Sequence, residues 1–223
     1  NEPMRSLKGV KVAIGPSTFA ALDSGPMNRL VEQGCTVIDN HFKRKLTKDE
    51  LLRLLGDDVI GLVAGLESLD REVMEKTNLK VISRCGSGMS NVDMQAADEL
   101  GIKVRSTPFG PTKAVAEITL GVMLSLLRMV PHMNKDLHDG KWAKKIGLQL
   151  TGKTVAIIGF GRIGHCLSKF LEPFKTRILA VDPYLDEPIE GASLVPLRKA
   201  LPQSDIISFH SAGESCIMGT DEF

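Results

Sequence analysis

The chain has 223 residues, of which 43% are hydrophobic and 25% are charged, values typical of a soluble globular protein with one or two domains. Lys and Arg total 28 and Asp and Glu total 27, so the charge balance argues against a nucleic acid or a membrane surface as a partner. Aromatic residues make up only 4% of the chain, too few to predict a stacking platform for single strands.

The cysteines indicate neither a metal site nor a disulfide framework. The four cysteines are Cys35, Cys85, Cys166 and Cys216. They are far apart and form no C-x-x-C pair, so no metal site is predicted. Scattered single cysteines are typical of a reducing compartment. No N-terminal signal is recognisable, and the longest apolar run, 118–127, is too short to cross a bilayer. We therefore expect a cytoplasmic protein.

Short apolar runs alternate with helical patterns over the first hundred residues. Thr47 and Glu50 have the spacing of a capping box and begin one of the helices. This alternation predicts an α/β domain over residues 1–105, with a flavodoxin-like parallel sheet covered by helices on both faces. The expected strands are 10–14, 35–38, 59–64, 80–83 and 102–104, and the expected helices are 25–33, 51–55, 70–76 and 92–100.

Two prolines and a glycine in the segment 106–111 mark a break between domains. Helical patterns follow over 112–129 and 133–139, and a loop over 148–152. A second alternating pattern then has strands at 154–158, 177–181 and 205–209, with helices at 163–172 and 197–201. Residues 106–223 are therefore predicted to form a second doubly wound parallel-sheet domain of the Rossmann type.

The start of this second pattern contains a G-x-G-x-x-G motif, Gly159-Phe-Gly-Arg-Ile-Gly164. Such a hexapeptide alone is weak evidence, but its context strengthens it. An apolar strand leads into it, a helical pattern leaves it, and Asp182 ends the next strand. Together these features match the dinucleotide-binding fingerprint.

Each position in the motif has a physical role. Gly159 would make the tight turn, Gly161 would let a pyrophosphate approach the backbone, and Gly164 would let the helix pack on the strand. The N–H groups of Arg162 and Ile163 would then face the phosphates from a helix N-terminus.

Asp182 would accept hydrogen bonds from the adenosine ribose and would repel a 2′-phosphate, which favours NAD over NADP as the cofactor. No arginine directly follows it to receive that phosphate. The alternative is that the glycines form a purely structural turn and that Asp182 only caps a loop.

A second glycine loop, Arg84-Cys-Gly-Ser-Gly88, follows a strand of the first domain. Ligands bind at the carboxyl edge of such sheets. Successive N–H groups of Gly86, Ser87 and Gly88 could form a nest for a small carboxylate. The alternative is a flexible connection with no ligand.

Taken together, these motifs resemble the D-isomer-specific 2-hydroxyacid dehydrogenases, and within them the D-3-phosphoglycerate dehydrogenases. The similarity covers nearly the whole chain. Its segments are 84–93, 106–108, 114–117, 140–142, 150–153, the motif at 159–164, and Asp182-Pro183. The order and spacing of these segments are more specific than any one of them.

The resemblance implies roles for several residues. Gly86, Ser87 and Gly88 match the loop that holds the substrate carboxylate, and Ser87 also matches a cofactor contact. The motif from Gly159 to Gly164 matches the pyrophosphate site, with Arg162 and Ile163 as contacts, and Asp182 matches the ribose contact. His210 and Ser211 match a cofactor-side His-Thr-Pro segment, here changed to His-Ser-Ala.

The family transfers hydride between nicotinamide and C2 of a 2-hydroxyacid, using a histidine as acid/base, a glutamate that orients it and an arginine that binds substrate. These three residues are expected beyond Phe223, so no catalytic residue is assigned within the chain. We expect the 223 residues alone to be inactive. We also expect the second sheet to lack strands 4 to 6, with its first strand as an exposed edge and with a helix beginning near residues 220–223.

The resemblance places 3-phosphoglycerate first among substrates. Some phosphoglycerate enzymes carry an arginine in a Val-Arg-Ser segment, where this chain reads Val63-Ala-Gly-Leu-Glu67. A phosphate would lose one cation there, so another small 2-hydroxyacid of the glyoxylate or hydroxypyruvate type is nearly as well supported. Two non-enzymatic alternatives are an NAD-binding scaffold similar to the C-terminal-binding-protein corepressors and a dimerisation module. The apolar helix over 118–130 suggests a homodimer or a higher homo-oligomer in either case.

Overall fold

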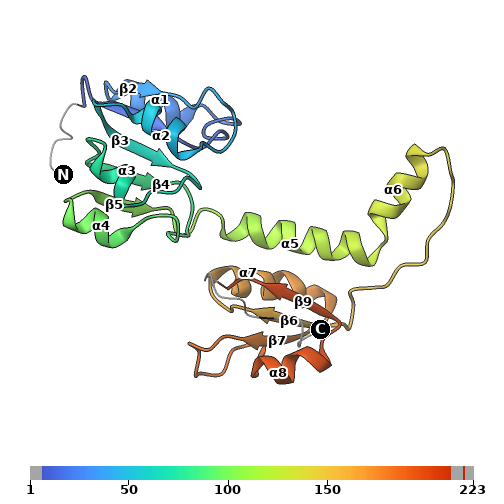
Figure 1. Cartoon of the computed structure of the whole chain (residues 1–223). Helices are drawn as coiled ribbons and strands as arrows, with labels where there is room; N and C mark the ends of the chain where they lie inside the picture. Colours follow the sequence, from blue (N-terminus) through green and yellow to red (C-terminus); the bar gives the residue numbers. More distant parts are fainter. Residues whose placement is uncertain (1–6, 212–217, 219–223) are drawn as a thin grey trace. The chain divides into compact units, whose positions relative to one another are not determined.

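The computed structural model describes residues 7–211 and residue 218, and the chain divides into two compact units, 1–110 and 111–223. Each unit is built on one parallel sheet, and helices connect all neighbouring strands in the chain except β7 (Arg177–Val181) and β8 (Ser193–Leu194) (Figure 1). The α/β class expected from the alternating pattern is confirmed. The division falls after Gly110 because Thr107 is still tied to the first unit, its N–H donating to the Gly86 carbonyl oxygen at 3.0 Å.

The sheet of the first unit has the strand order β2-β1-β3-β4-β5, which is the flavodoxin-like order expected from the sequence. All its neighbouring strands are parallel. The strands are β1 (Lys11–Ile14), β2 (Thr36–Ile38), β3 (Val59–Ala64), β4 (Val81–Arg84) and β5 (Lys103–Ser106). The helices are α1 (Gly25–Glu32), α2 (Lys48–Leu55), α3 (Arg71–Glu75) and α4 (Met94–Glu99).

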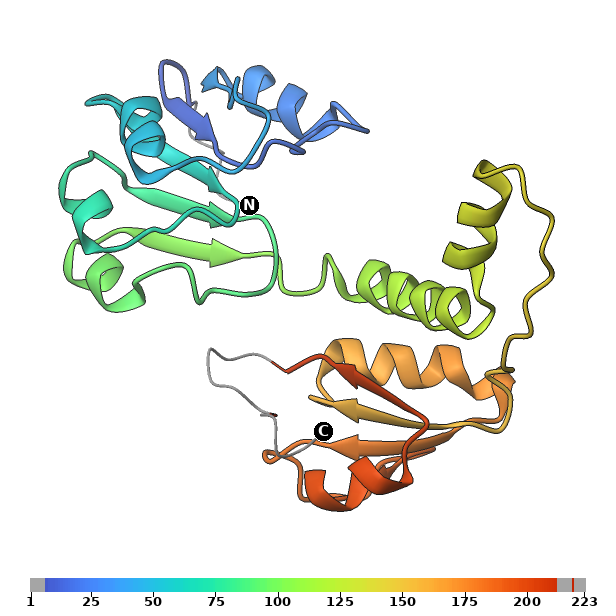
Figure 2. The same cartoon turned by 45° about the vertical axis from the view of Figure 1, so that its right-hand side comes forward.

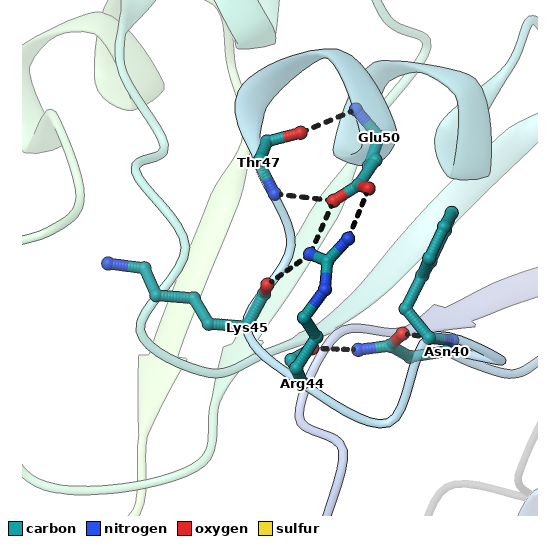
Figure 3. Close-up of polar contacts among 6 residues, drawn as sticks. Asn40, Arg44, Lys45, Thr47 and Glu50 are labelled. Carbon is teal, nitrogen blue, oxygen red and sulfur yellow. Dashed lines mark hydrogen bonds and ion pairs between the residues drawn. The ribbon is translucent and has the colours of Figure 1, made fainter.

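The expected capping box begins α2 (Figure 3). Thr47 Oγ1 accepts from the Glu50 N–H, and the Glu50 carboxylate accepts from the Thr47 N–H at 2.9 Å. The guanidinium of Arg44 also reaches both oxygens of Glu50, at 2.6 and 2.8 Å. The Arg44 hydrogen bond, followed by the Thr47 N–H, lowers the pKa of Glu50 to about 2. The hydrogen bonds among Arg44, Thr47 and Glu50 therefore fix the backbone at the N-terminus of α2.

The core of the first unit lies where α2, α3 and α4 pack on the sheet, and the second face of the sheet is only partly covered. Buried Leu51, Val73 and Ala96 come from these three helices and share one cluster with the strands. In β4 and β5, however, buried and exposed residues alternate, and Val81 is 45% exposed. The expectation that both faces are covered is therefore wrong for this half of the sheet, because the unit supplies no buried helical side chain to that face among its described residues.

The second unit packs helices on both faces of its sheet. Helices α5 and α7 lie side by side on one face, and α8 lies on the other (Figure 2). The helices are α5 (Thr112–Leu127), α6 (Val130–His138), α7 (Arg162–Leu171) and α8 (Leu197–Ala200), with 3-10 turns at Glu172–Phe174 and Leu201–Gln203. The strands are β6 (Thr154–Ile158), β7 (Arg177–Val181), β8 (Ser193–Leu194) and β9 (Ile206–Phe209).

The strand order of this sheet, β8-β7-β6-β9, corrects two expectations. The sequence pattern missed β8, a two-residue strand that pairs with β7. Consequently β9 is the fourth strand of the unit, and it pairs with β6 on the side opposite β7. The first strand, β6, is therefore internal, and β9 forms the open edge within the described residues. The helix expected near 220–223 lies outside the described residues.

An apolar cavity of about 720 Å³ runs along this open edge. It is lined by Ile118, Val122 and Leu126 of α5, by the loop at 146–148 and by β9. Ile118 and Leu126 are each 63% exposed, so this face of α5 is unpartnered in the described part of the unit.

Three further features of the described residues are their helix lengths, their possible metal ligands and their cysteines. Among them no single helix is long and apolar enough to cross a membrane, although α5 and α6 together pass that test across a bend of 65°. No group of three or more His, Cys, Asp or Glu gathers within this part of the chain as a metal site. Cys35, Cys85 and Cys166 are free thiols, and Cys216 lies outside the described residues.

Candidate functional site

The turn after β6 requires glycine at its first position. Gly159 has φ +87°, a conformation that residues with a Cβ rarely adopt. A methyl group on it would lie 2.4 Å from the Ser211 nitrogen and 2.6 Å from the His210 carbonyl carbon. The turn that follows β6 therefore lies directly against the backbone that follows β9. The tertiary structure thus brings Gly159, His210 and Ser211 together at the carboxyl edge of the sheet.

The other two glycines of the motif are in different environments. Gly161 is the N-cap of α7, and a methyl group there would meet nothing within 4 Å. Gly164 is buried in α7, where a methyl group would lie 2.7 Å from the Gly159 carbonyl oxygen. Gly164 therefore serves helix packing, whereas Gly161 leaves the approach to the helix open.

The N-terminus of α7 fits a phosphate group. The N–H groups in the first turn of an α-helix have no acceptor within the helix, and here the N-cap residue, Gly161, has no side chain to cap them. Arg162 and Ile163 occupy this first turn. With the free space at Gly161, the residues present suit a dinucleotide pyrophosphate, which would approach the backbone and be favoured by the helix dipole.

Asp182 lies just after β7 and is bound to the glycine turn, a contact that sequence reasoning missed. Its carboxylate accepts from the Phe160 N–H at 2.9 Å and from the Tyr184 N–H at 3.0 Å. Asp182 therefore shapes the turn, as the structural alternative supposed. Each carboxylate oxygen can accept a further hydrogen bond, so this contact is compatible with a ribose contact.

His210 follows β9, and its Nε2 lies 2.8 Å from the Oγ of Ser208. Burial lowers the pKa of His210 below its usual range, which favours the neutral imidazole. A neutral ring that is hydrogen-bonded to a buried serine suits a packing surface beside a ligand better than a charged one would.

The glycine loop of the first unit is organised by two residues to which the sequence analysis gave no role. Gly86 has φ +138°, and its N–H donates to Thr107 Oγ1 at 2.8 Å. The guanidinium of Arg84, which is 7% exposed, lies directly against Gly86, because a methyl group there would be 2.3 Å from Arg84 Nη1. The Gly86 N–H is therefore already hydrogen-bonded within the unit, to Thr107 Oγ1. Ser87 and Gly88 retain N–H groups without an acceptor in the described residues.

Short motifs mark the residues that make these contacts, but not the contacts themselves. The Ser106-Thr-Pro108 segment was noted as a motif without a reason, and the Thr107 hydroxyl supplies one. Asn91, in the same motif as the loop, accepts from Arg84 Nε at 3.3 Å and donates to the carbonyl oxygens of Gly65 and Glu67 at 3.1 and 2.7 Å. No local pattern reveals these long-range contacts.

Comparison with known proteins identifies the domain that contains the glycine turn at 159–164. Residues 120–215 match the family model described as D-isomer specific 2-hydroxyacid dehydrogenase, NAD binding domain. The matched range contains the glycine turn, Asp182, His210 and Ser211. Residues 120–215 of the chain belong to the D-isomer-specific 2-hydroxyacid dehydrogenase family. The part of the chain matched by this model is the family's NAD-binding domain.

Relatives extend the similarity into the first unit. A hydroxypyruvate reductase of Thermotoga maritima is 38% identical over 168 residues, which cover 74% of this chain and 55% of the relative. The human D-3-phosphoglycerate dehydrogenase is 32% identical over 188 residues, covering 82% of this chain and 35% of that protein. The chain thus spans about half, or about a third, of the length of these relatives.

A solved structure with the same arrangement is the TT0316 protein of Thermus thermophilus. It has a TM-score of 0.78 and 29% identity over 91% of this chain and 65% of that one. Because both a hydroxypyruvate reductase and phosphoglycerate dehydrogenases are relatives, family membership alone leaves the substrate open.

Proposed function

We propose that this chain provides the cofactor-binding part of an NAD-dependent oxidoreductase that transfers hydride between nicotinamide and C2 of a small D-2-hydroxyacid. The observation that carries the proposal is the glycine-capped N-terminus of α7 beside Asp182. Gly161 leaves space for a pyrophosphate, and Asp182 stands at the end of the neighbouring strand β7. This is the arrangement of a dinucleotide site at the carboxyl edge of a parallel sheet.

The residues of the second unit would bind and orient the cofactor. NAD, when bound, accepts or supplies the hydride. Gly159, Gly161 and Gly164 would shape the turn, and the N–H groups of Arg162 and Ile163 would hold the pyrophosphate. Asp182 would accept hydrogen bonds from the adenosine ribose. His210 and Ser211, which adjoin Gly159, would form one wall of the site.

The first unit would hold the substrate. The free N–H groups of Ser87 and Gly88 would bind the substrate carboxylate, with Gly86 supplying the turn and the Arg84 guanidinium lying directly against it. Ser87 would also touch the cofactor. The acid/base histidine, its glutamate partner and the arginine are expected outside residues 1–223, and this stays a prediction.

Two substrate classes remain candidates. Overall similarity favours 3-phosphoglycerate. A specific observation favours a small unphosphorylated 2-hydroxyacid of the glyoxylate or hydroxypyruvate type: the segment that follows β3 carries no cation and instead carries the buried Glu67, 2% exposed. We also propose a homodimer or higher homo-oligomer, supported by the exposed apolar face of α5. A scaffold that binds NAD without turnover is the alternative to an enzyme.

A test of the cofactor assignment is the substitution Asp182→Ser. We expect NADH binding, measured by fluorescence titration, to weaken by about tenfold, because a charge-assisted hydrogen bond is lost, and the preference for NADH over NADPH to shrink. Asp186→Ser, an exposed carboxylate on the same segment, is the matched control and should change neither value. An unchanged cofactor preference in Asp182→Ser would contradict the ribose assignment.

A test of the activity is steady-state turnover of small 2-oxoacids with NADH by the intact protein. An enzyme is expected to reach at least about 1 per second with one of them. Tight NADH binding without turnover of any small 2-oxoacid would support the scaffold instead.

A further inference from the structure

A buried carboxylate lies between the ends of two neighbouring strands of the first unit. Glu67 is 2% exposed, and its carboxylate is enclosed by Gly15, which follows β1, and Gly65, which follows β3. A methyl group on Gly15 would lie 2.9 Å from Glu67 Cδ, and one on Gly65 would lie 3.1 Å from Glu67 Oε1. A Cβ at Gly15 would therefore force the Glu67 carboxylate to shift, and one at Gly65 would crowd it.

Few hydrogen-bond donors or cations stabilise this buried carboxylate. Its one hydrogen-bond donor among the described residues is the Gly65 N–H, at 2.6 Å from Oε2. No Lys, Arg or His nitrogen in this part of the chain lies within ion-pair distance of it. The buried guanidinium of Arg84 is directed instead to Asn91 Oδ1 and to the Cys85 carbonyl oxygen. A buried acidic group is ordinarily paired, so this one calls for a functional reason.

The position of Glu67 within the sheet points to a ligand. In the order β2-β1-β3-β4-β5, chain direction along the sheet reverses between β1 and β3, and ligands bind in the crevice at such a switch point. The carboxylate lies at the carboxyl ends of these same two strands.

Hydrogen bonds connect this position to the candidate carboxylate loop. The side-chain amide of Asn91 donates to the Glu67 carbonyl oxygen at 2.7 Å, while its Oδ1 accepts from Arg84 Nε at 3.3 Å. Arg84 in turn lies against Gly86. Glu67 and the loop at 84–88 are therefore held in one rigid frame within one unit.

We propose that Glu67 determines substrate specificity: its negative charge makes the site select 2-hydroxyacids whose C3 substituent is a neutral hydrogen-bond donor and reject those that carry a phosphate. The proposal rests on the proposed function, because it places the substrate carboxylate on Ser87 and Gly88. The substituent then extends toward the crevice between β1 and β3. There a poorly hydrated carboxylate repels a phosphate dianion strongly, because the interior screens charge less than water does.

The test is the substitution Glu67→Gln in the intact protein. Glutamine keeps the shape and an oxygen that can accept from the Gly65 N–H, and it removes only the charge. We expect the wild type to have a higher kcat/KM for hydroxypyruvate than for 3-phosphohydroxypyruvate. In Glu67→Gln this ratio should shift toward the phosphorylated acid by about tenfold or more, mainly through a lower KM for that acid, since repulsion acts on binding.

The matched control is Glu75→Gln, an exposed carboxylate on α3 of the same unit, which should leave the ratio unchanged. An unchanged ratio in a folded Glu67→Gln protein would overturn the proposal. If that variant does not fold, the wild type decides: D-glycerate must inhibit at least about ten times more strongly than 3-phosphoglycerate, and the reverse order overturns the proposal. Failure of the wild type to reduce any small 2-oxoacid would instead refute the proposed function, on which this inference rests.

Discussion

The two glycine turns of this protein follow parallel strands in similar sheets, but they need glycine for different reasons. At Gly159 the obstacle to a side chain is backbone, that of His210 and Ser211. At Gly86 the obstacle is the end of the Arg84 side chain. The turn at Gly159 is therefore held by the sheet itself, because it packs against the backbone at the end of the neighbouring strand β9. The second is held by side chains, those of Arg84 and Thr107.

This difference predicts how each turn responds to substitution. A backbone neighbour cannot move without disturbing β9, whereas a guanidinium can adopt another rotamer. The turn at Gly159, which we propose binds the cofactor, should therefore tolerate less change than the turn at Gly86, even though both glycines have positive φ. The following experiments test this comparison.

The largest expected effect is that of Gly159→Ala. Strain at φ +87° combined with backbone overlap should cost about 3 kcal/mol or more and lower the Tm of the second unit by on the order of 10 °C, as measured by calorimetry. Gly191→Ala is the control, because Gly191 has φ +74° but free space around it, so it reports strain alone. Equal losses in the two variants would show that the overlap with Ser211 contributes nothing. The loss of stability in Gly86→Ala should lie between the losses in Gly159→Ala and Gly191→Ala.

A large effect on binding without an effect on folding is expected for Gly161→Ala. Free space surrounds this position in the protein itself, so the free energy of unfolding should change by less than about 1 kcal/mol. The added methyl group would occupy the path of the pyrophosphate, so NADH affinity, measured by titration, should fall by at least about tenfold. In the control Gly121→Ala, within α5, the affinity should stay unchanged. Wild-type affinity in Gly161→Ala would place the cofactor elsewhere.

The smallest effect concerns the first unit and depends on pH. The pKa of Glu50 in the folded protein, about 2, is below its ordinary value of 4.5, so its ionised form stabilises the fold above about pH 4.5. This stabilisation is lost as the pH falls from 4.5 toward 2. Glu50→Gln should therefore be less stable than the wild type at pH 7, and the difference should shrink across that interval in urea denaturation.

Glu32→Gln serves as the comparison for Glu50, because Glu32 is exposed and has no ion pair among the described residues. Its difference from the wild type should be small at every pH. A Glu50→Gln difference that persists at pH 2 would mean that Arg44 and Thr47 do not stabilise the carboxylate.

Local signals in the sequence predicted most elements. The Thr47–Glu50 spacing, the apolar runs of β3 and β6 and the glycine pattern before α7 each act within a few residues, so they can be recognised without knowledge of the fold. The two-residue β8 escaped because it has no periodicity of its own. Its absence from the prediction misplaced β9, and with it the open edge of the sheet.

The candidate site divides in the same way. The sequence by itself determined the α/β class and the position of the glycine turn, and it predicted the roles of Asp182 and the loop at 84–88, because these depend on short motifs. Only the tertiary structure decided that Asp182 holds the turn through Phe160, that Thr107 uses the Gly86 N–H, and that Glu67 lies buried between β1 and β3. Those contacts join residues that are distant in the chain, and packing of the strands alone brings them within hydrogen-bond or van der Waals distance.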